Sequence, residues 1–223
     1  MTARLVIVPA RGGSKRLPGK NLRSLAGRPL IDWTAKALAE SELAAECLLT
    51  TDDPEIAEAG RKTGWLVPFL RPAELARDES PTIDAVIHAL NWYSATRGSD
   101  PDIVILLQLT SPFRSGRDIR DAVLLLEAHR DANAVVGMMP HGDGRHGSWI
   151  VADGFVRRAD GQPAKEAYEP NGAIYAIRAD VLRQARDFYP QRTLAHVMPA
   201  ERSIDIDDAD DWRRAEELAK AIA

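Results

Sequence analysis

The chain has 223 residues, 45% of them hydrophobic, which is enough for one large domain to bury a core without disulfide bridges. Lysine and arginine total 29 against 33 aspartates and glutamates, and this net charge of −4 argues against a protein that binds nucleic acid through bulk positive charge. Because the single Cys47 can form no internal disulfide and no apolar run approaches the roughly 20 residues that cross a bilayer, we expect a cytoplasmic location and no membrane partner.

Short β-rich runs alternate with amphipathic helical stretches along the chain. The runs that predict strands are residues 4–9, 46–51, 65–70, 102–109, 133–139 and 171–177. Between them, apolar residues recur at helical spacing, in the sets Leu30, Trp33, Ala37 and Leu38; Ile83, Val86, Ile87 and Leu90; and Ile119, Ala122, Val123 and Leu126. This alternation predicts a single α/β domain over residues 1–223, with a mostly parallel sheet and crossover helices on its faces.

Residues 140–170 interrupt the alternation. They contain five glycines, three prolines and short apolar runs such as residues 149–151, which are typical of small antiparallel strands. We interpret this stretch as an insertion within the one domain that forms a lid or a subunit contact, with a plain surface loop as the alternative.

A glycine-rich, basic loop, VPARGGSKRLPGKNL (residues 8–22), directly follows the first predicted strand. In open α/β sheets such a loop lies where ligands bind, and glycine lets the backbone approach a phosphate closely. The spacing is not that of a P-loop, because five residues separate Gly13 from Gly19 and Lys20 is followed by Asn21. We expect a triphosphate here, with a solvated loop as the alternative; the basic residues are Arg11, Lys15, Arg16 and Lys20.

Two acidic residues alternate with isoleucines in the segment SIDID. In an extended chain Asp205 and Asp207 then face one way, while Ile204 and Ile206 face the other. A pair of carboxylates suits Mg²⁺, which completes its shell with water and substrate phosphate. The alternative is that these acids only cap the terminal helix, which we favour for Asp208 and Asp210.

Five blocks in order resemble the acylneuraminate cytidylyltransferases, also called CMP-sialic acid synthetases: the loop at 8–22, LRPAELARDESPT (70–82), LLQLTSPFR (106–114), PNGAIY (170–175) and SIDIDDADD (203–211). The resemblance implies a Rossmann-like fold with a small dimerisation insertion and a homodimer. It also implies an enzyme that transfers CMP from CTP to the anomeric hydroxyl of a 3-deoxy-2-keto sugar acid, uses Mg²⁺ and releases pyrophosphate.

The resemblance assigns roles to residues that match the family's motifs. Lys20 and Arg11 contact the triphosphate, with Lys20 at the α-phosphate, and Asp207 holds metal together with Asp205 or accepts the acceptor's proton. The expected nucleotide site is Arg11, Gly12, Gly13, Ser14, Lys20, Asn21, Pro81 and Thr82. In the family, the segment that matches Asp78 to Thr82 recognises cytosine; the alternative is that these residues are only an ordinary helix start. The expected acceptor site is Gln108, Ser111, Asn171 and Gly172, with Thr110 and Arg114 at the same strand end.

Two positions depart from the family's pattern. Leu109 stands where the family has Pro, and Glu169 stands where it commonly has an Arg that helps to hold the sugar carboxylate. Either a nearby cation replaces that Arg, or Glu169 points elsewhere, or the acceptor differs, for example an octulosonate or a phosphonate; the candidate cations are Arg157, Arg158 and Lys165. A nucleotide-binding protein without catalytic activity is the alternative from another class, and a P-loop-like kinase is disfavoured by the loop spacing.

Overall fold

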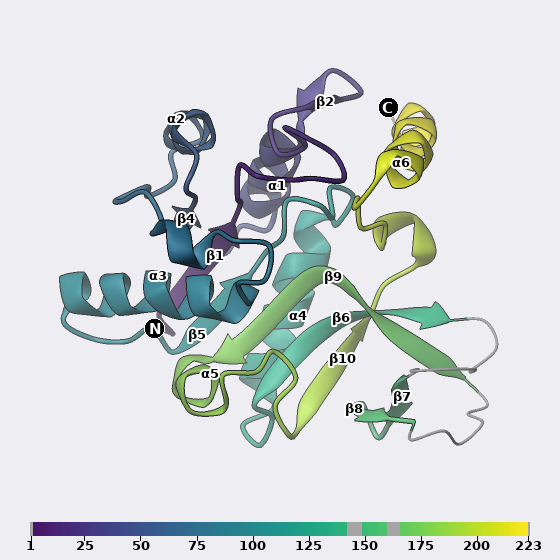
Figure 1. Ribbon diagram of the computed structural model, residues 1–223. Coiled ribbons are helices and arrows are strands. Elements are labelled where there is room, and N and C mark those ends of the chain that lie inside the picture. The colour runs from purple at the N-terminus through teal and green to yellow at the C-terminus, as the bar shows by residue number, and fades with distance from the viewer. Residues whose placement is uncertain (1, 142–148, 160–165, 223) are drawn as a thin grey trace.

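The computed structural model describes residues 2–141, 149–159 and 166–222, which form a central sheet with helices on both faces (Figure 1). The sheet has eight strands in the order β4-β1-β5-β9-β6-β10-β8-β7, and β2 and β3 form a separate two-stranded sheet. The strands are β1 (Arg4–Pro9), β2 (Ser24–Leu25), β3 (Arg28–Pro29), β4 (Glu46–Thr50), β5 (Ile103–Leu106), β6 (Ala134–His141), β7 (Trp149–Ala152), β8 (Phe155–Arg158), β9 (Ala167–Arg178) and β10 (Thr193–Val197). The helices are α1 (Leu30–Glu40), α2 (Pro54–Lys62), α3 (Thr82–Arg97), α4 (Gly116–Ala128), α5 (Ala179–Ala185) and α6 (Ala209–Ile222), with short 3₁₀ turns η1 (Ala73–Leu75) and η2 (Ala200–Arg202). The predicted α/β class is confirmed.

The sheet is mixed, where the sequence predicted a mostly parallel one. Strands β4, β1 and β5 are parallel, and so are β6 and β10, but β9 runs antiparallel between β5 and β6. The stretch 140–170 begins in β6 and ends in β9, and its described residues form strands and no helix. Parallel neighbours need a crossover connection, usually a helix, whereas β6 and β9 pair antiparallel and form a long hairpin that carries β7 and β8 in its connection.

The predicted small strands inside residues 140–170 are present. Strand β7 pairs antiparallel with β8, and Trp149 of β7 also pairs with Tyr168 of β9. Residues 142–148 and 160–165 of this predicted insertion lie outside the described residues. Its use as a lid or dimerisation segment stays a prediction.

The strand predicted at residues 65–70 is wrong. Only Leu66 pairs, through one parallel bridge to Leu48, and Pro68 has no amide hydrogen to continue a ladder. Leu70 is 49% exposed, so the apolar run does not lie inside the sheet. Helix α2, which the apolar pattern did not predict, ends just before this run and begins after Asp53, whose side chain accepts hydrogen bonds from the amides of Glu55 and Ile56.

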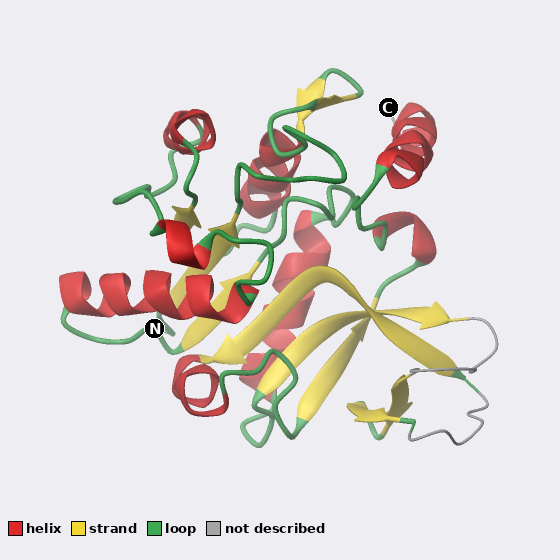
Figure 2. Ribbon diagram, in the orientation of Figure 1, coloured by secondary structure: helices red, strands yellow, loops and turns green. Residues whose placement is uncertain are grey.

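The core forms two layers because side chains alternate along each strand. Val6 and Val8 of β1 pack in the layer with helices α1, α4 and α6, whereas Leu5 and Ile7 pack in the layer with α3 and α5. Figure 2 shows α3 and α5 in front of the strands and α4 behind them. Both faces of the sheet are therefore covered, and polar side chains that bind a ligand have to gather at the ends of the strands.

Candidate active site

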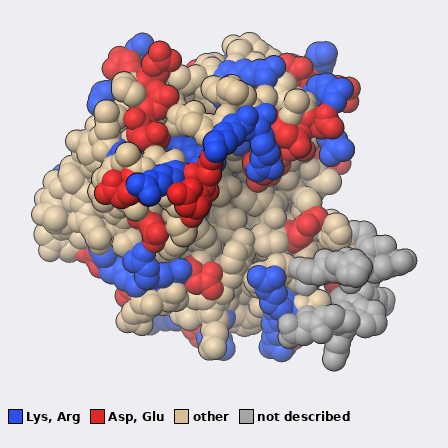
Figure 3. Space-filling view, in the orientation of Figure 1, with Lys and Arg blue, Asp and Glu red and all other residues tan. Residues whose placement is uncertain are grey.

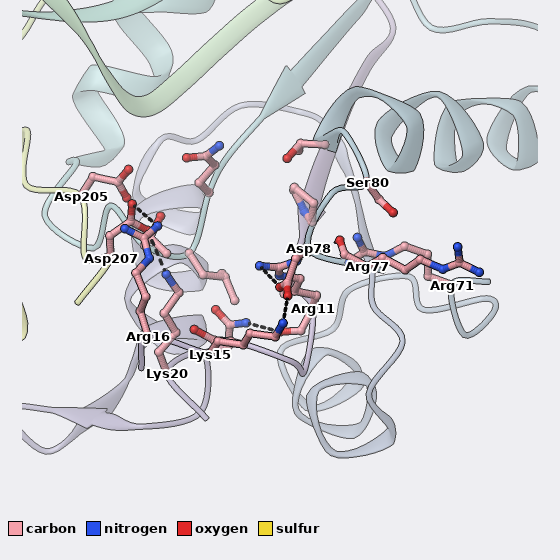
Figure 4. Close-up of a pocket in the computed structure, with 18 of the residues that line it drawn as sticks. Arg11, Lys15, Arg16, Lys20, Arg71, Arg77, Asp78, Ser80, Asp205 and Asp207 are labelled. Atoms are coloured by element: carbon pink, nitrogen blue, oxygen red, sulfur yellow. Dashed lines mark hydrogen bonds and ion pairs between the residues drawn. The ribbon is translucent and has the colours of Figure 1, made fainter. Parts of the chain in front are cut away.

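A cavity of about 610 Å³ opens at the carboxyl ends of β1 and β5 (Figure 4). Four segments line it: the loop that follows β1, the stretch from Arg71 to Thr82, residues 108–110 after β5, and the extended segment that carries Asp205 and Asp207. The cationic loop and the distant aspartates therefore meet, as the sequence predicted.

Asn21 holds the loop after β1 in place. Its side chain is buried and donates a hydrogen bond from Nδ2 to the carbonyl oxygen of Arg11 at 2.9 Å, while its own carbonyl accepts from Ile31 at the start of α1. This bond joins the two ends of the loop. Ser14 and Asn21 both line the cavity, so this bond positions the part of the loop that faces it.

Gly12 and Gly13 do not line the cavity, although they were expected in the nucleotide site. The amide of Gly12 donates to Oδ1 of Asp52 at 3.1 Å, and a Cβ at this position would lie 2.5 Å from Oδ2 of Asp53. Glycine is thus required here for close packing against the start of α2. Gly13 has no heavy atom within 4 Å of the place where a Cβ would lie.

Two carboxylates each hold two of the loop's four cations. Asp207 pairs with Lys20 at 3.3 Å and with Arg16 at 3.0 Å, and Lys20 Nζ also donates to the carbonyl of Ile206 at 2.8 Å. Asp78 pairs with Arg11 at 3.0 Å and with Lys15 at 2.5 Å. Figure 4 shows these as two separate groups, and Figure 3 shows acidic and basic side chains beside each other across the upper part of this face.

Asp205 has no cation within ion-pair distance among the described residues. Its residue is exposed and its carboxylate opens to the cavity, but the surrounding protein partly desolvates it and the negative Asp207 lies nearby, so its pKa is raised above the usual 3.8. A Cβ at Gly172 would lie 3.3 Å from Asp205 Oδ2, so the glycine leaves the space beside this carboxylate open. Two hard oxygen donors at an open site, one of them lacking a counter-ion, fit Mg²⁺.

We expect Asp205→Asn to raise the melting temperature at neutral pH by no more than about 1 °C, because the side chain is exposed and solvent screens its charge. A raised carboxyl pKa means that the ionised group destabilises the fold, a cost that is absent well below pH 4 and grows as the pH rises. The gain should therefore shrink as the pH is lowered toward 4, which thermal unfolding at several pH values measures. Asp207→Asn, which loses two ion pairs, should give no such gain.

Residues at the start of α3 form one wall of the cavity. Ser80 and Thr82 line it, and the Ser80 hydroxyl donates to the carbonyl of Glu74 at 2.6 Å. Pro81, which was expected in the nucleotide site, is the N-cap of α3 and lies outside the lining. Arg71, which the sequence reasoning did not single out, also lines this wall; it is buried and donates to the carbonyl of Thr50 at 2.8 Å.

Two residues of the expected acceptor site, Gln108 and Ser111, lie around a third, Gly172. Gly172 has a φ of +72°, and a Cβ there would meet Gln108 Oε1 at 2.9 Å and Ser111 Oγ at 3.5 Å, as well as Asp205. Gln108 lines the cavity, whereas Ser111 is fully buried and its hydroxyl has no hydrogen-bond partner in the described part of the chain. This corner joins the end of β5 and the middle of β9 to Asp205.

Asn171, the fourth residue of that expected site, does not line the cavity. It is buried, and its amide donates to Ser203 Oγ at 2.9 Å and to Met198 Sδ at 3.2 Å, while its Oδ1 accepts from the amide of Ala173. These bonds fix the segment that leads into Asp205. In this structure Asn171 positions the acidic segment instead of facing a ligand.

Arg114 is buried, although its place in the motif suggested a ligand nearby. Its Nη1 donates to the carbonyls of Gln108 at 2.8 Å and Ser111 at 2.7 Å, and its Nη2 donates to Thr34 Oγ1 at 2.6 Å. Burial lowers the pKa of this guanidinium, against the attraction of Asp205 and Asp118. Arg114 thus fixes the loop that presents Gln108 to the cavity.

Arg114→Met should lower the free energy of unfolding by about 2–4 kcal/mol, because two carbonyls and a hydroxyl lose a charged donor inside the protein. Urea denaturation measures this loss. Arg117→Met is the control: Arg117 is 81% exposed and pairs with Asp121 one helical turn away, so its loss should cost no more than about 0.5 kcal/mol. Equal effects of the two variants would contradict this role.

Glu169 pairs with His141 on the neighbouring strand β6, at 2.5 Å from Nδ1. It is not among the residues that line the cavity. Of the explanations for its departure from the family's pattern, this geometry favours a side chain that points elsewhere. Lys165, one candidate for a replacing cation, lies outside the described residues.

Among the described residues, no helix is long and apolar enough to cross a membrane. Within the same residues, no group of three or more His, Cys, Asp or Glu side chains forms a metal site. A two-carboxylate site remains compatible with Mg²⁺, which usually takes only one or two protein carboxylates.

Comparison with known proteins agrees with this geometry. A family model described as cytidylyltransferase matches residues 5–220. The chain is 36% identical over 224 residues to the CMP-N,N'-diacetyllegionaminic acid synthase of Legionella pneumophila, covering 96% of this chain and 95% of that protein. It is 32% identical over 221 residues to the N-acylneuraminate cytidylyltransferase of Escherichia coli O18:K1:H7, covering 95% of this chain but only 51% of that longer protein.

A solved structure of CMP:2-keto-3-deoxy-manno-octonic acid synthetase in complex with CTP superimposes with a TM-score of 0.76 over the whole of both chains. The sequence identity is 19%, so this similarity is one of fold. A glucose-1-phosphate thymidylyltransferase from Bacillus anthracis, described as putative, has the same general fold with a TM-score of 0.71 at 15% identity.

Proposed function

Because the chain belongs to the cytidylyltransferase family and is a CTP-dependent nucleotidyltransferase, we propose that it transfers CMP from CTP to the anomeric hydroxyl of a 3-deoxy-2-keto sugar acid, with release of pyrophosphate. The observation that carries this proposal is the meeting of four loop cations with Asp205 and Asp207 in one cavity. An in-line attack on a phosphate needs positioning and charge stabilisation more than covalent chemistry from the protein.

Lys20 is the group we propose at the α-phosphate. Its side chain is only 13% exposed, and it is held by Asp207 and the carbonyl of Ile206, which points its ammonium at the acidic end of the cavity. Arg11 and Lys15 lie with Asp78 in a separate group and would take the terminal phosphates. The cytosine would lie against Ser80 and Thr82 at the start of α3, where the Thr82 hydroxyl and the first amides of the helix would offer donors and acceptors.

We propose that Asp205 and Asp207 hold Mg²⁺. The support is the cavity-facing carboxylate of Asp205, which has a raised pKa and lacks a counter-ion in the described part of the chain. When bound, Mg²⁺ would neutralise charge on the phosphate oxygens. Asp207 would exchange its two cations for the metal, which would leave Lys20 available to the nucleotide.

For the acceptor, we propose the corner formed by Gln108, Ser111 and Gly172, next to Asp205. The relative named as a legionaminic acid synthase matches over nearly its whole length, so a nonulosonic acid of that class is the first acceptor to test. An octulosonate or a phosphonate is the alternative acceptor, and a nucleotide-binding protein without turnover is the alternative function.

The test is pyrophosphate release from CTP and Mg²⁺ with a panel of acceptors: N,N'-diacetyllegionaminate, N-acetylneuraminate, a 2-keto-3-deoxyoctonate and a phosphonate. We expect release with at least one nonulosonate, a product whose mass is that of the CMP-sugar, and little turnover when ATP replaces CTP. Calorimetry that shows CTP binding without turnover on any acceptor would instead support the non-catalytic alternative.

We also propose a homodimer in the cytoplasm, with the hairpin of β6 and β9 and the strands β7 and β8 as the subunit contact. The support is the position of this hairpin, whose β7 and β8 end the sheet order. Light scattering during size-exclusion chromatography should give about twice the mass of the 24.5 kDa chain, and a monomeric mass would contradict the dimer.

A further inference from the structure

Asp78 ties the phosphate loop to the segment before α3. Its two carboxylate oxygens contact different cations of the loop, Arg11 at 3.0 Å and Lys15 at 2.5 Å. Arg11 also donates from Nη1 to the carbonyl of Arg77 at 2.9 Å, so the contact fixes both side chain and backbone of this segment. Figure 4 shows Asp78 between the group around Asp207 and the wall formed by Arg71, Arg77 and Ser80.

Asp78 occupies the contacts with Arg11 and Lys15 that an anionic ligand in the cavity would make. Arg11 and Lys15 both line the cavity and are the loop cations that lie away from Asp205 and Asp207. The pairing lowers the pKa of Asp78 and raises that of Lys15, as expected for oppositely charged partners. A phosphate that takes over the donors now bonded to Asp78 has to replace its carboxylate, and the displaced carboxylate then repels the phosphate.

We propose that Asp78 is an internal competitor of the pyrophosphate moiety: it weakens the binding of the terminal phosphates of CTP and takes back Arg11 and Lys15 as pyrophosphate leaves. This inference rests on the proposed function, in which Arg11 and Lys15 take the terminal phosphates and Lys20 the α-phosphate. It makes Asp78 a specificity-determining residue, because ligands with terminal phosphates have to displace it and CMP does not.

The experiment measures the dissociation constants of pyrophosphate, CTP and CMP by calorimetry, for the wild type and Asp78→Asn. Two exposed ion pairs are broken in the variant, so we expect it to bind pyrophosphate and CTP roughly threefold to tenfold more tightly, with CMP unchanged within about twofold. Pyrophosphate should also inhibit turnover of the variant at correspondingly lower concentrations.

Glu79→Gln is the matched control. It removes the same unit charge one residue away, from an exposed side chain that does not line the cavity and acts on Lys15 only through weaker, longer-range attraction. Its affinities for all three ligands should stay within about twofold of the wild type. Asp78→Ala is a second variant, which guards against new contacts made by the side-chain amide that Asp78→Asn introduces. Thermal unfolding confirms that the variants are folded.

Unchanged or weaker pyrophosphate binding in both Asp78 variants, while the wild type binds CTP, would overturn the inference and indicate that Asp78 only fixes the loop. Equal tightening in Glu79→Gln would overturn it too, because net charge would then explain the effect. A wild type that binds no CTP would contradict the proposed function, which is a distinct result.

Discussion

Lys20→Ala is expected to lower kcat by about 10²- to 10³-fold, the effect seen when one preorganised donor to a transition state is lost. The side chain is largely enclosed and its ammonium is held by Asp207 and the carbonyl of Ile206, so it needs little reorganisation to meet charge that develops on the α-phosphate. The measurement is the initial rate of pyrophosphate release with CTP and acceptor at saturation.

Arg16→Ala is the control for this prediction. Arg16 pairs with the same Asp207, but its side chain is 67% exposed, and its loss should change kcat by less than about fivefold. Both variants remove one cation from Asp207, so the difference between them isolates the position of Lys20. Near-normal turnover in Lys20→Ala, with the fold intact by thermal unfolding, would contradict its place at the α-phosphate.

The positions of most strands could be predicted from the sequence, but the direction of one could not. Apolar runs identify buried strands such as β1 and β4, since burial is what the pattern records. The direction of β9 depends on how residues 140–170 return the chain, and no apolar pattern carries that information. The strand prediction at residues 65–70 was wrong for a related reason, because apolar character does not provide the amide hydrogens that pairing between strands needs.

The candidate site was predictable where neighbouring residues determine it. The alternation in SIDID and the basic loop both predicted groups of like chemistry, and the structure brings them into one cavity. The partners of Arg11 and Arg114 were not predictable, because Asp78 and Thr34 are more than sixty residues away from them and meet them only through packing. The need for glycine at position 12 was unpredictable for the same reason, because the residue packed closely against it is Asp53, the N-cap of α2.

Asp207→Asn is expected to lower kcat/KM by about 10³-fold and to weaken the binding of Mn²⁺, used as a probe for Mg²⁺, by about tenfold or more in the presence of CTP. Asparagine keeps the shape but removes the charge that balances a divalent ion and pairs with Lys20 and Arg16. Electron paramagnetic resonance of free Mn²⁺ measures the affinity without any turnover. Asp210→Asn, an exposed acid in the first turn of α6, is the control and should leave Mn²⁺ affinity unchanged within about twofold.

The same pair of measurements separates two roles for Asp207. If it holds the metal with Asp205, both Asp→Asn variants should lose Mn²⁺ affinity, and the double variant should lose little more than either one, because two groups that act on one ion are not additive. If Asp207 instead accepts the proton of the acceptor hydroxyl, Asp207→Asn should keep its Mn²⁺ affinity while turnover falls and the acidic limb of the pH–rate profile disappears. Unchanged Mn²⁺ affinity in all three variants would remove the acidic pair from the metal site, and the phosphates alone would then have to hold the ion.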